Sequence, residues 1–295
     1  MSSDASSIKE LREKTGAGIV ECKKALIESN GDINAAIDLL RKKGVVSAAK
    51  KSSRIASDGL STVFIKDKNG VAVEINTETD FVAKNDQFKN LVSSISETAI
   101  NCSSIEELNS SKMHDRTVVS EAITNAIAII GENITLRRMA KIQVQNGFVA
   151  SYVHGAITKT MGKISVLVGI ETDCKDEAAA KTLGNQIAMH IAAAKPICLH
   201  SSEVDSQLIA KEKELFFEQY KASGKPDNIV EKMVEGRVKK FYEESVLLEQ
   251  IFVVDGKTKI NDLLVAFEKQ NGCKFSVTKF VRYEVGEGIE QSDAE

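Results

Sequence analysis

The spacing of apolar residues changes along the chain from a helical period to a strand period. Within the first 45 residues, apolar positions recur at helical spacing in three short segments, and Asp32 precedes the third segment as a candidate N-cap. From residue 59 onward, apolar-rich runs of period two surround a turn signal at residues 68–70. The pattern predicts a small three-helix unit followed by an antiparallel hairpin.

The plan of strands and helices then occurs a second time. Helical spacing at residues 85–100 and 115–132 is followed by a strand-like run at 139–145. Two further strands are predicted on either side of a turn at Met161 and Gly162, and a long alanine-rich helix follows them.

The string Glu-Thr-Asp occurs at residues 78–80 and again 93 positions later at residues 171–173. We interpret this spacing as an internal repeat. It predicts an α+β fold with two related subdomains, each a small antiparallel sheet with helices on one face.

These patterns divide the chain into four parts. They are an N-terminal helical module with a basic linker (1–54), a first core subdomain (55–146), a second core subdomain (147–285) with a helical hairpin inserted at about 203–245, and a polar tail (286–295). A short helix at 261–269 and a final strand at 274–285 are expected to complete the second sheet.

The inserted hairpin has a narrow apolar stripe on each arm, with a stop signal at 223–226 between the arms. The stripe residues are Val204, Leu208, Leu215, Val230, Val234, Val238 and Phe241. Such a hairpin projects from the body and contacts another molecule, or it is a simple solvated hairpin.

Composition limits the class of partner. The net charge is −3, and only 5% of the residues are aromatic, with no tryptophan. The chain therefore has no general attraction to nucleic acid and few surfaces on which bases could stack. It has no apolar run of about 18 residues and no signal peptide pattern at its start, so we expect a cytoplasmic protein without membrane association.

Cysteine spacing argues against a disulfide scaffold or a zinc knuckle. The five cysteines are odd in number, scattered and free of any C-x-x-C pair. We expect them to be small buried apolar residues.

Residues 41–54 carry six basic residues and no acidic one. One interpretation is a contact with an acidic surface, a phosphate backbone or the ribosome. The other is a solvated helix end and linker, in which the first three cations complement the last carbonyls of the third helix.

No catalytic or cofactor pattern is found. Gly-rich phosphate loops are absent, and the four histidines lack metal-ligand spacing. Asp80 and Asp173 have no nucleophile or metal ligand nearby in the sequence, so helix capping explains them better than acid–base chemistry. We expect neither an enzyme nor a bound metal or cofactor.

Phe81 stands out because it follows Asp80 in a stretch of charged and amide residues. At the 93-residue offset it corresponds to Cys174, so the architecture does not require a large aromatic residue there. Phe81 is either a group presented to a partner or a core residue beneath its own hairpin.

Five motifs in order along the chain carry a resemblance to a known family. They are TGAGIVECKKAL (15–26), GDINAAIDLLRKKG (31–44), TDFVAKNDQF (79–88), KPDNIVEKMVEGRVKKF (225–241) and RYEVGEGIE (282–290). Together they resemble bacterial elongation factor Ts over essentially the whole chain. The first motif alone also resembles ubiquitin-associated three-helix modules.

The resemblance implies a guanine nucleotide exchange factor of translation elongation that performs no covalent chemistry. Its partner would be elongation factor Tu with bound GDP, and it would promote GDP release, and so GTP reloading, by disturbing the partner's magnesium and phosphate site. The disrupting element would consist of Thr79, Asp80, Phe81 and Val82.

The resemblance also implies a docking surface on the N-terminal module, carried by Gly16, Gly18, Ile19, Val20 and Lys23. Many family members have methionines where this chain has Ile19 and Val20, although the apolar character is the same. The helical hairpin would serve as a dimerisation or auxiliary contact element. The competing hypothesis is a non-catalytic adaptor that binds a client through the helical module, with Phe81 in its own core.

Overall fold

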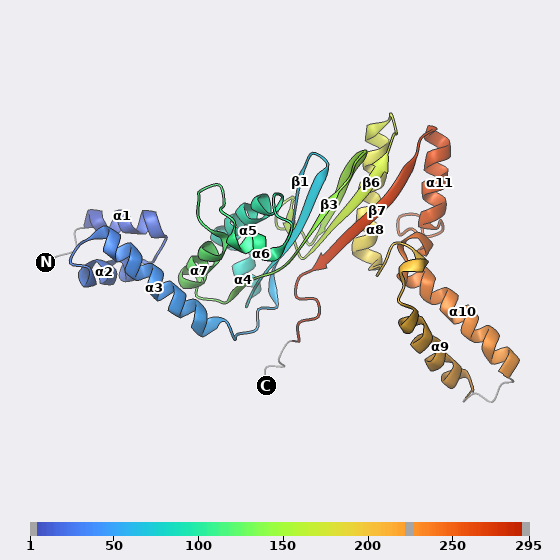
Figure 1. Ribbon diagram of the computed structural model, residues 1–295, viewed down its shortest axis with the longest axis horizontal. Helices are drawn as coiled ribbons and strands as arrows, with labels where there is room; N and C mark the ends of the chain where they lie inside the picture. The colour runs from blue at the N-terminus through green and yellow to red at the C-terminus, as the bar shows by residue number, and fades with distance from the viewer. Residues whose placement is uncertain (1–4, 222–226, 291–295) are drawn as a thin grey trace.

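The computed structural model describes residues 5–221 and 227–290 (Figure 1). A small helical unit lies at one end, two antiparallel sheets with their helices form the body, and a pair of antiparallel helices projects from the other end (Figure 1). The predicted α+β class is confirmed.

The N-terminal unit contains helices α1 (Ala5–Thr15), α2 (Ile19–Glu28) and α3 (Ile33–Lys51). The Asp32 carboxylate accepts hydrogen bonds from two backbone N–H groups of α3, so the predicted N-cap is confirmed. The three helices enclose one small cluster of buried residues: Leu11, Cys22, Ala25, Leu26 and Ala36.

The first subdomain is a sheet with helices on one face. Its elements are β1 (Asp58–Lys66), β2 (Asn69–Thr77), α4 (Asp80–Ala83), α5 (Asp86–Ala99), α6 (Ile105–Ser110), α7 (Val119–Ile130) and β3 (Ile134–Gln143). The hairpin of β1 and β2 is confirmed, but its turn lies at Asp67 and Lys68 rather than at residues 68–70, because Asn69 and Gly70 already pair within β2. Alternate β2 residues such as Val73 and Ile75 join the core under the helices, as a period of two requires.

Helix α3 is longer than predicted, because the basic stretch continues it to Lys51. The interpretation of the first three cations as a helix end is therefore wrong. Arg41 forms an ion pair with Glu121 of α7, and Lys51 donates a hydrogen bond to the carbonyl oxygen of Ile127 at 3.3 Å. These cations join the N-terminal unit to the first subdomain.

The second subdomain repeats the arrangement. Its elements are β4 (Gly147–His154), β5 (Met161–Gly162), β6 (Ile164–Thr172), α8 (Glu177–Ala194), α11 (Ile260–Asn271) and β7 (Phe275–Glu284). Strand β7 pairs with β6, so the last strand completes the second sheet as predicted. The turn predicted at Met161 and Gly162 is wrong, because these residues form β5, which pairs with β1.

The two sheets pack against each other through their inner faces. The first has the strand order β3-β2-β1-β5 and the second β4-β6-β7. Apolar residues from both form a shared cluster: Val63, Ala72, Ile142, Val144, Val149, Leu167 and Val281. Figure 1 shows α5 and α7 on one side of this double sheet and α8 and α11 on the other. Each sheet thus has helices on one face, as predicted.

The projecting hairpin consists of α9 (Ser206–Lys221) and α10 (Asp227–Ser245), flanked by the short 3₁₀ helices η1 (Ser201–Glu203) and η2 (Leu247–Glu249). Phe216 packs against Val230, Val234 and Val238 between the arms. Leu215 was expected in this stripe, but it is 59% exposed. The stop signal at 223–226 lies outside the described residues.

The central strands of the two subdomains are related by 95 positions rather than 93. Asn69 and Ile164 begin β2 and β6, and both strands are nine residues long. Each strand has a register shift at the same internal position, after Glu74 in β2 and after Gly169 in β6. The corrected offset makes Phe81 equivalent to Asp176, not to Cys174.

The last helix and strand of each subdomain also correspond, at an offset of 141 positions. Helices α7 and α11 both have 12 residues, and strands β3 and β7 both have 10. Gly131 and Gly272 end the two helices with left-handed backbone conformations. The larger offset reflects the hairpin inserted between α8 and α11.

Candidate partner-binding site

The candidate site is the corner at which strand β2 leads into the single helical turn α4. Thr79 has extended backbone angles and is the N-cap residue of α4. Asp80 lies in the first turn, where a negative charge complements the helix dipole. The corner therefore presents four consecutive residues, 79–82, in one compact turn.

Phe81 points away from the core and is 79% exposed. The next two residues, Val82 and Ala83, are buried in the first subdomain. The interpretation that Phe81 packs beneath its own hairpin is therefore wrong. Burying a phenylalanine is worth about 1.5–3 kcal/mol, and this gain remains unused in the free protein.

A charged pair lies beside the exposed ring. Lys84 Nζ is 2.7 Å from a carboxylate oxygen of Asp80 and 5.9 Å from the centre of the Phe81 ring. The hydrogen bond from Lys84 lowers the pKa of Asp80, so this carboxylate is charged at neutral pH. Asp80 is half-exposed and therefore accessible to a partner.

The chain beyond the corner is fixed by a second cap. The side-chain oxygen of Asn85 accepts hydrogen bonds from the backbone N–H groups of Gln87 and Phe88 at the start of α5. Phe88 is fully buried. The corner is thus held between a central strand and an anchored helix.

Glu132 holds the corner through hydrogen bonds to residues 77–79. This residue was not predicted from the sequence. Its carboxylate accepts hydrogen bonds from the Thr79 hydroxyl at 2.7 Å, the Thr79 N–H at 3.0 Å, the Glu78 N–H at 3.1 Å and the Thr77 hydroxyl at 2.8 Å. Glu132 follows Gly131 at the end of α7. No local pattern could have revealed it, because the contact spans more than fifty residues.

Glu78 makes a reciprocal contact. Its carboxylate accepts a hydrogen bond from the Asn133 N–H at 2.6 Å and lies 3.5 Å from the Arg54 guanidinium. The segments 77–79 and 132–133 are therefore bonded in both directions. We call this set of hydrogen bonds the corner latch.

The five residues expected to form the docking surface lie at the start of α2. Ile19 and Val20 are 56% and 63% exposed, and Lys23 is exposed as well. Gly18 is the N-cap residue of α2, and Gly16 adopts a positive φ of 67°.

The structure brings the turn at Gly16 close to the helices of the first subdomain. A Cβ atom at Gly16 would lie 3.1 Å from the side chain of Ile129 and 3.6 Å from that of Gln87. Gln87 lies in the first turn of α5, directly after the corner. The docking residues and the corner are therefore on neighbouring elements.

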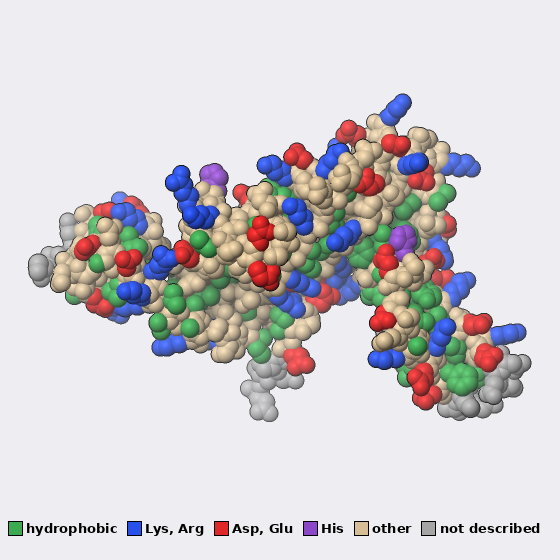
Figure 2. Space-filling view, viewed as in Figure 1, with side chains coloured by type: hydrophobic (Ala, Val, Ile, Leu, Met, Phe, Trp, Pro, Cys, Tyr) green, Lys and Arg blue, Asp and Glu red, His purple; other side chains and the backbone are tan. Residues whose placement is uncertain are grey.

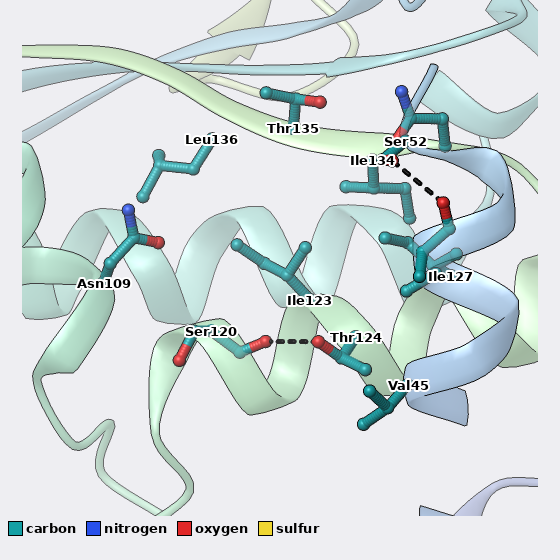
Figure 3. Close-up of a pocket in the computed structure, with 13 residues that line it drawn as sticks. Val45, Ser52, Asn109, Ser120, Ile123, Thr124, Ile127, Ile134, Thr135 and Leu136 are labelled. Atoms are coloured by element: carbon teal, nitrogen blue, oxygen red, sulfur yellow. Dashed lines mark hydrogen bonds between the residues drawn. The ribbon is translucent and has the colours of Figure 1, made fainter. Parts of the chain in front are cut away.

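A hollow of about 490 Å³ lies between α3, α7 and β3 (Figure 3), and Asn133 of the corner latch is one of its lining residues. The side chains that line it are apolar, hydroxyl or amide groups, such as Val45, Ile123, Thr124 and Leu136. The Thr124 hydroxyl donates to the backbone carbonyl of Ser120 at 2.8 Å. The lining thus supplies no ionisable group for acid–base chemistry.

Charge is mixed over the visible surface. Figure 2 shows acidic and basic side chains interspersed over the body and the hairpin. Within residues 5–221 and 227–290, no three His, Cys, Asp or Glu side chains are grouped closely enough to bind a metal ion. In the same ranges, no helix is both long and apolar enough to cross a membrane.

Comparison with known proteins gives a family. The family model described as elongation factor TS matches residues 78–287. Elongation factor Ts of Rickettsia bellii (strain OSU 85-389) is 50% identical over 289 residues, which cover 98% of this chain and 94% of the relative. The proteins of the same name from Rickettsia felis and Rickettsia typhi are each 48% identical over the same shares.

The chain is therefore a translation elongation factor that functions in protein biosynthesis. It belongs to the elongation factor Ts family.

Proposed function

We propose that the protein is a guanine nucleotide exchange factor for elongation factor Tu and performs no covalent chemistry. It binds the GDP form of this partner in the cytoplasm and promotes GDP release, so that GTP can be loaded. Membership of the elongation factor Ts family supports the choice of partner. The single observation that carries the mechanism is the exposure of Phe81 on a latched corner.

Exchange follows from differential binding. A factor that binds its partner more tightly without nucleotide must weaken nucleotide binding by the same factor. Insertion of Phe81 into an apolar pocket would supply about 1.5–3 kcal/mol, which offsets displacement of groups that hold the magnesium ion and phosphates. This corresponds to about a ten- to hundredfold effect.

The four residues of the element have different roles in this proposal. Phe81 and Asp80 are exposed enough to contact the partner. Thr79 is bonded to Glu132, and Val82 is buried. Thr79 and Val82 therefore hold the turn, while Phe81 and Asp80 act on the partner.

The N-terminal module supplies affinity. Ile19 and Val20 offer an apolar surface, and Lys23 adds a charge one turn further along α2. We place the docking contact there, with Gly16 and Gly18 shaping the start of the helix.

The helical hairpin is an additional contact arm in this proposal, either to the partner or to a second copy of the chain. Leu215 and Ile229 are exposed on its two helices. Sedimentation of the wild type and of a Leu215→Glu/Ile229→Glu variant would test the dimer. An unchanged mass would exclude these residues as a dimer contact.

Stopped-flow release of a fluorescent GDP from elongation factor Tu tests the proposal. We expect rapid release with the wild type and about a ten- to hundredfold slower release with Phe81→Ala. Val265→Ala is the matched control, because Val265 is also an exposed apolar residue but lies on α11. Failure of the wild type to accelerate release would overturn the exchange function, and an unaffected Phe81→Ala variant would overturn the role of the ring.

The adaptor hypothesis required Phe81 to be a core residue. Its exposed ring removes that premise. We therefore do not propose the adaptor function.

A further inference from the structure

The two repeats share one half of the corner latch. In the first, the Asn133 N–H donates to the carboxylate of Glu78 at 2.6 Å. At the equivalent positions of the second, the Lys274 N–H donates to the carboxylate of Asp173 at 2.7 Å. This bond therefore belongs to the architecture that both subdomains use to join the central strand to the last strand.

The other half of the latch occurs only in the first repeat. The position equivalent to Glu132 is Cys273, and the position equivalent to Thr79 is Cys174. A thiol at position 273 cannot replace a carboxylate that accepts four hydrogen bonds. The second subdomain folds without this set of bonds, so the Glu132 carboxylate is not required by the architecture.

The extra bonds are located where an apolar side chain is exposed. Three of the four Glu132 contacts go to Glu78 and Thr79, the two residues directly before α4. An exposed ring on a single helical turn loses orientational freedom when it binds, and prior ordering of its backbone reduces that loss.

We propose that Glu132 is a positioning residue that sets the orientation of Phe81 before the partner is met. The expected effect on GDP release rests on the proposed exchange function. The orientation of Phe81 by Glu132 does not depend on that function. Bonds to a charged carboxylate are stronger than bonds between neutral groups, which suits Glu132 to hold the backbone at the start of a helix of only four residues.

Tryptophan fluorescence tests the geometry without the partner. The chain contains no tryptophan, so Phe81→Trp places a single indole at the corner. We expect the amplitude of the fast, nanosecond part of its anisotropy decay to increase when Glu132→Ala is added. Glu97→Ala is the control, because it removes an exposed carboxylate on α5, and we expect it to leave this amplitude unchanged. Equal amplitudes with and without Glu132 would overturn the proposal.

Exchange kinetics test the consequence. We expect Glu132→Ala to lower the maximal rate of GDP release about tenfold at saturating concentration of the factor. Glu132→Gln keeps the shape and one acceptor oxygen, so we expect it to recover part of the rate. Unfolding curves of each variant give the temperature range in which all of them are folded, and the rates are compared there.

A double-mutant cycle separates positioning from a general loss of structure. If Glu132 acts through Phe81, adding Glu132→Ala to Phe81→Ala should change the rate by less than about twofold. A full additional tenfold loss would overturn the proposal, because Glu132 would then act independently of the ring. If the wild type does not accelerate GDP release from elongation factor Tu, the proposed exchange function is wrong. The anisotropy measurement still decides whether Glu132 orients residue 81.

Discussion

The two subdomains have similar central strands, yet the corners that follow these strands differ. After β2 the chain exposes Phe81, and after β6 the equivalent residue, Asp176, caps helix α8 by accepting a hydrogen bond from the Ala179 N–H at 2.9 Å. The first corner has the complete latch with Glu132. The first corner thus exposes an apolar side chain to solvent, whereas the side chain at the second corner accepts a hydrogen bond from a backbone N–H of the helix that follows it.

This difference shows how a repeated scaffold can expose an apolar side chain at one site only. The sheets, the helices α7 and α11 and the shared half of the latch maintain the architecture in both subdomains. The exposed ring and its extra carboxylate are added in the first. Substitutions at matched positions can therefore separate stability from function.

The largest expected difference in the free energy of unfolding is between substitutions of two phenylalanines seven positions apart. Phe88 is fully buried and Phe81 is exposed. We expect Phe88→Ala to lower the free energy of unfolding by about 3–5 kcal/mol, because it leaves a cavity in the core. We expect Phe81→Ala to change it by less than about 0.5 kcal/mol. Urea unfolding followed by circular dichroism measures both, and similar losses would contradict the exposed position of Phe81.

The next effect concerns a buried carboxylate that the second sheet lacks. Glu74 is fully buried, and the equivalent position in β6 is Gly169. Burial acts to raise the pKa of Glu74, but the Gly286 N–H and two arginines, Arg137 and Arg138, outweigh it and hold the pKa below its ordinary value of 4.5.

A carboxylate whose pKa is lower in the folded state stabilises the protein above its unfolded pKa, and this contribution is lost as the pH falls through the folded pKa. We expect Glu74→Gln to lower the free energy of unfolding by about 3 kcal/mol at pH 7, because it removes the buried negative charge that Arg137 and Arg138 share, while Arg138 keeps its ion pair with Glu287. The loss should shrink below pH 4.5. Unfolding curves from pH 7 to pH 3 measure this, and a constant difference would show that Glu74 is not the titrating group.

A smaller effect is expected at the second corner. Asp176→Ala removes the N-cap of α8, so we expect a loss of about 1 kcal/mol in the free energy of unfolding. GDP release should remain at the wild-type rate, in contrast to Phe81→Ala at the equivalent position. Thermal unfolding measures the loss of stability, and stopped-flow kinetics measure the rate of GDP release. Slower GDP release with unchanged stability would contradict the prediction and would indicate that the second corner contacts the partner.

Local patterns were sufficient to predict much of this fold. The Asp32 cap, the first hairpin and the pairing of the last strand all depend on short-range turn and capping chemistry. Strand β5 was mistaken for a turn because two residues cannot show a period, and its pairing with β1 is a tertiary contact.

The candidate site was only partly predictable. The sequence pointed to Phe81, but its exposure depends on whether the turn α4 directs residue 81 or residue 82 to the core. The repeat was found at an offset of 93 because the two Glu-Thr-Asp strings match by letter. Strand register gives 95, which places Glu171 within β6 and Glu78 after β2. Glu132 was missed because its role exists only after α7 and β2 have come together.

The smallest expected effect is a pH dependence of stability between pH 7 and pH 5, which we expect from a buried histidine in the second subdomain. His190 is fully buried on α8, and the equivalent residue on α5 is Ile95. Its Nε2–H donates to Gln250 at 2.9 Å, and its Nδ1 accepts a hydrogen bond from the Val253 N–H at 3.3 Å. The ring is therefore neutral in the folded protein.

Burial lowers the pKa of His190, and the bond to Gln250 opposes this only in part. A group with a lowered pKa stabilises the folded state above its unfolded pKa, here 6.5, and that stability is lost as the pH falls through the folded value. Protonation would also remove the acceptor of the Val253 N–H. We expect wild-type stability to fall between pH 7 and pH 5 more steeply than that of His190→Asn, with the exposed His154→Asn as the matched control for loss of one histidine. If stability depends on pH in the same way in the wild type and in His190→Asn, the His190 ring does not change its protonation on unfolding. The pH dependence would then have to come from carboxylates, which occur in both subdomains.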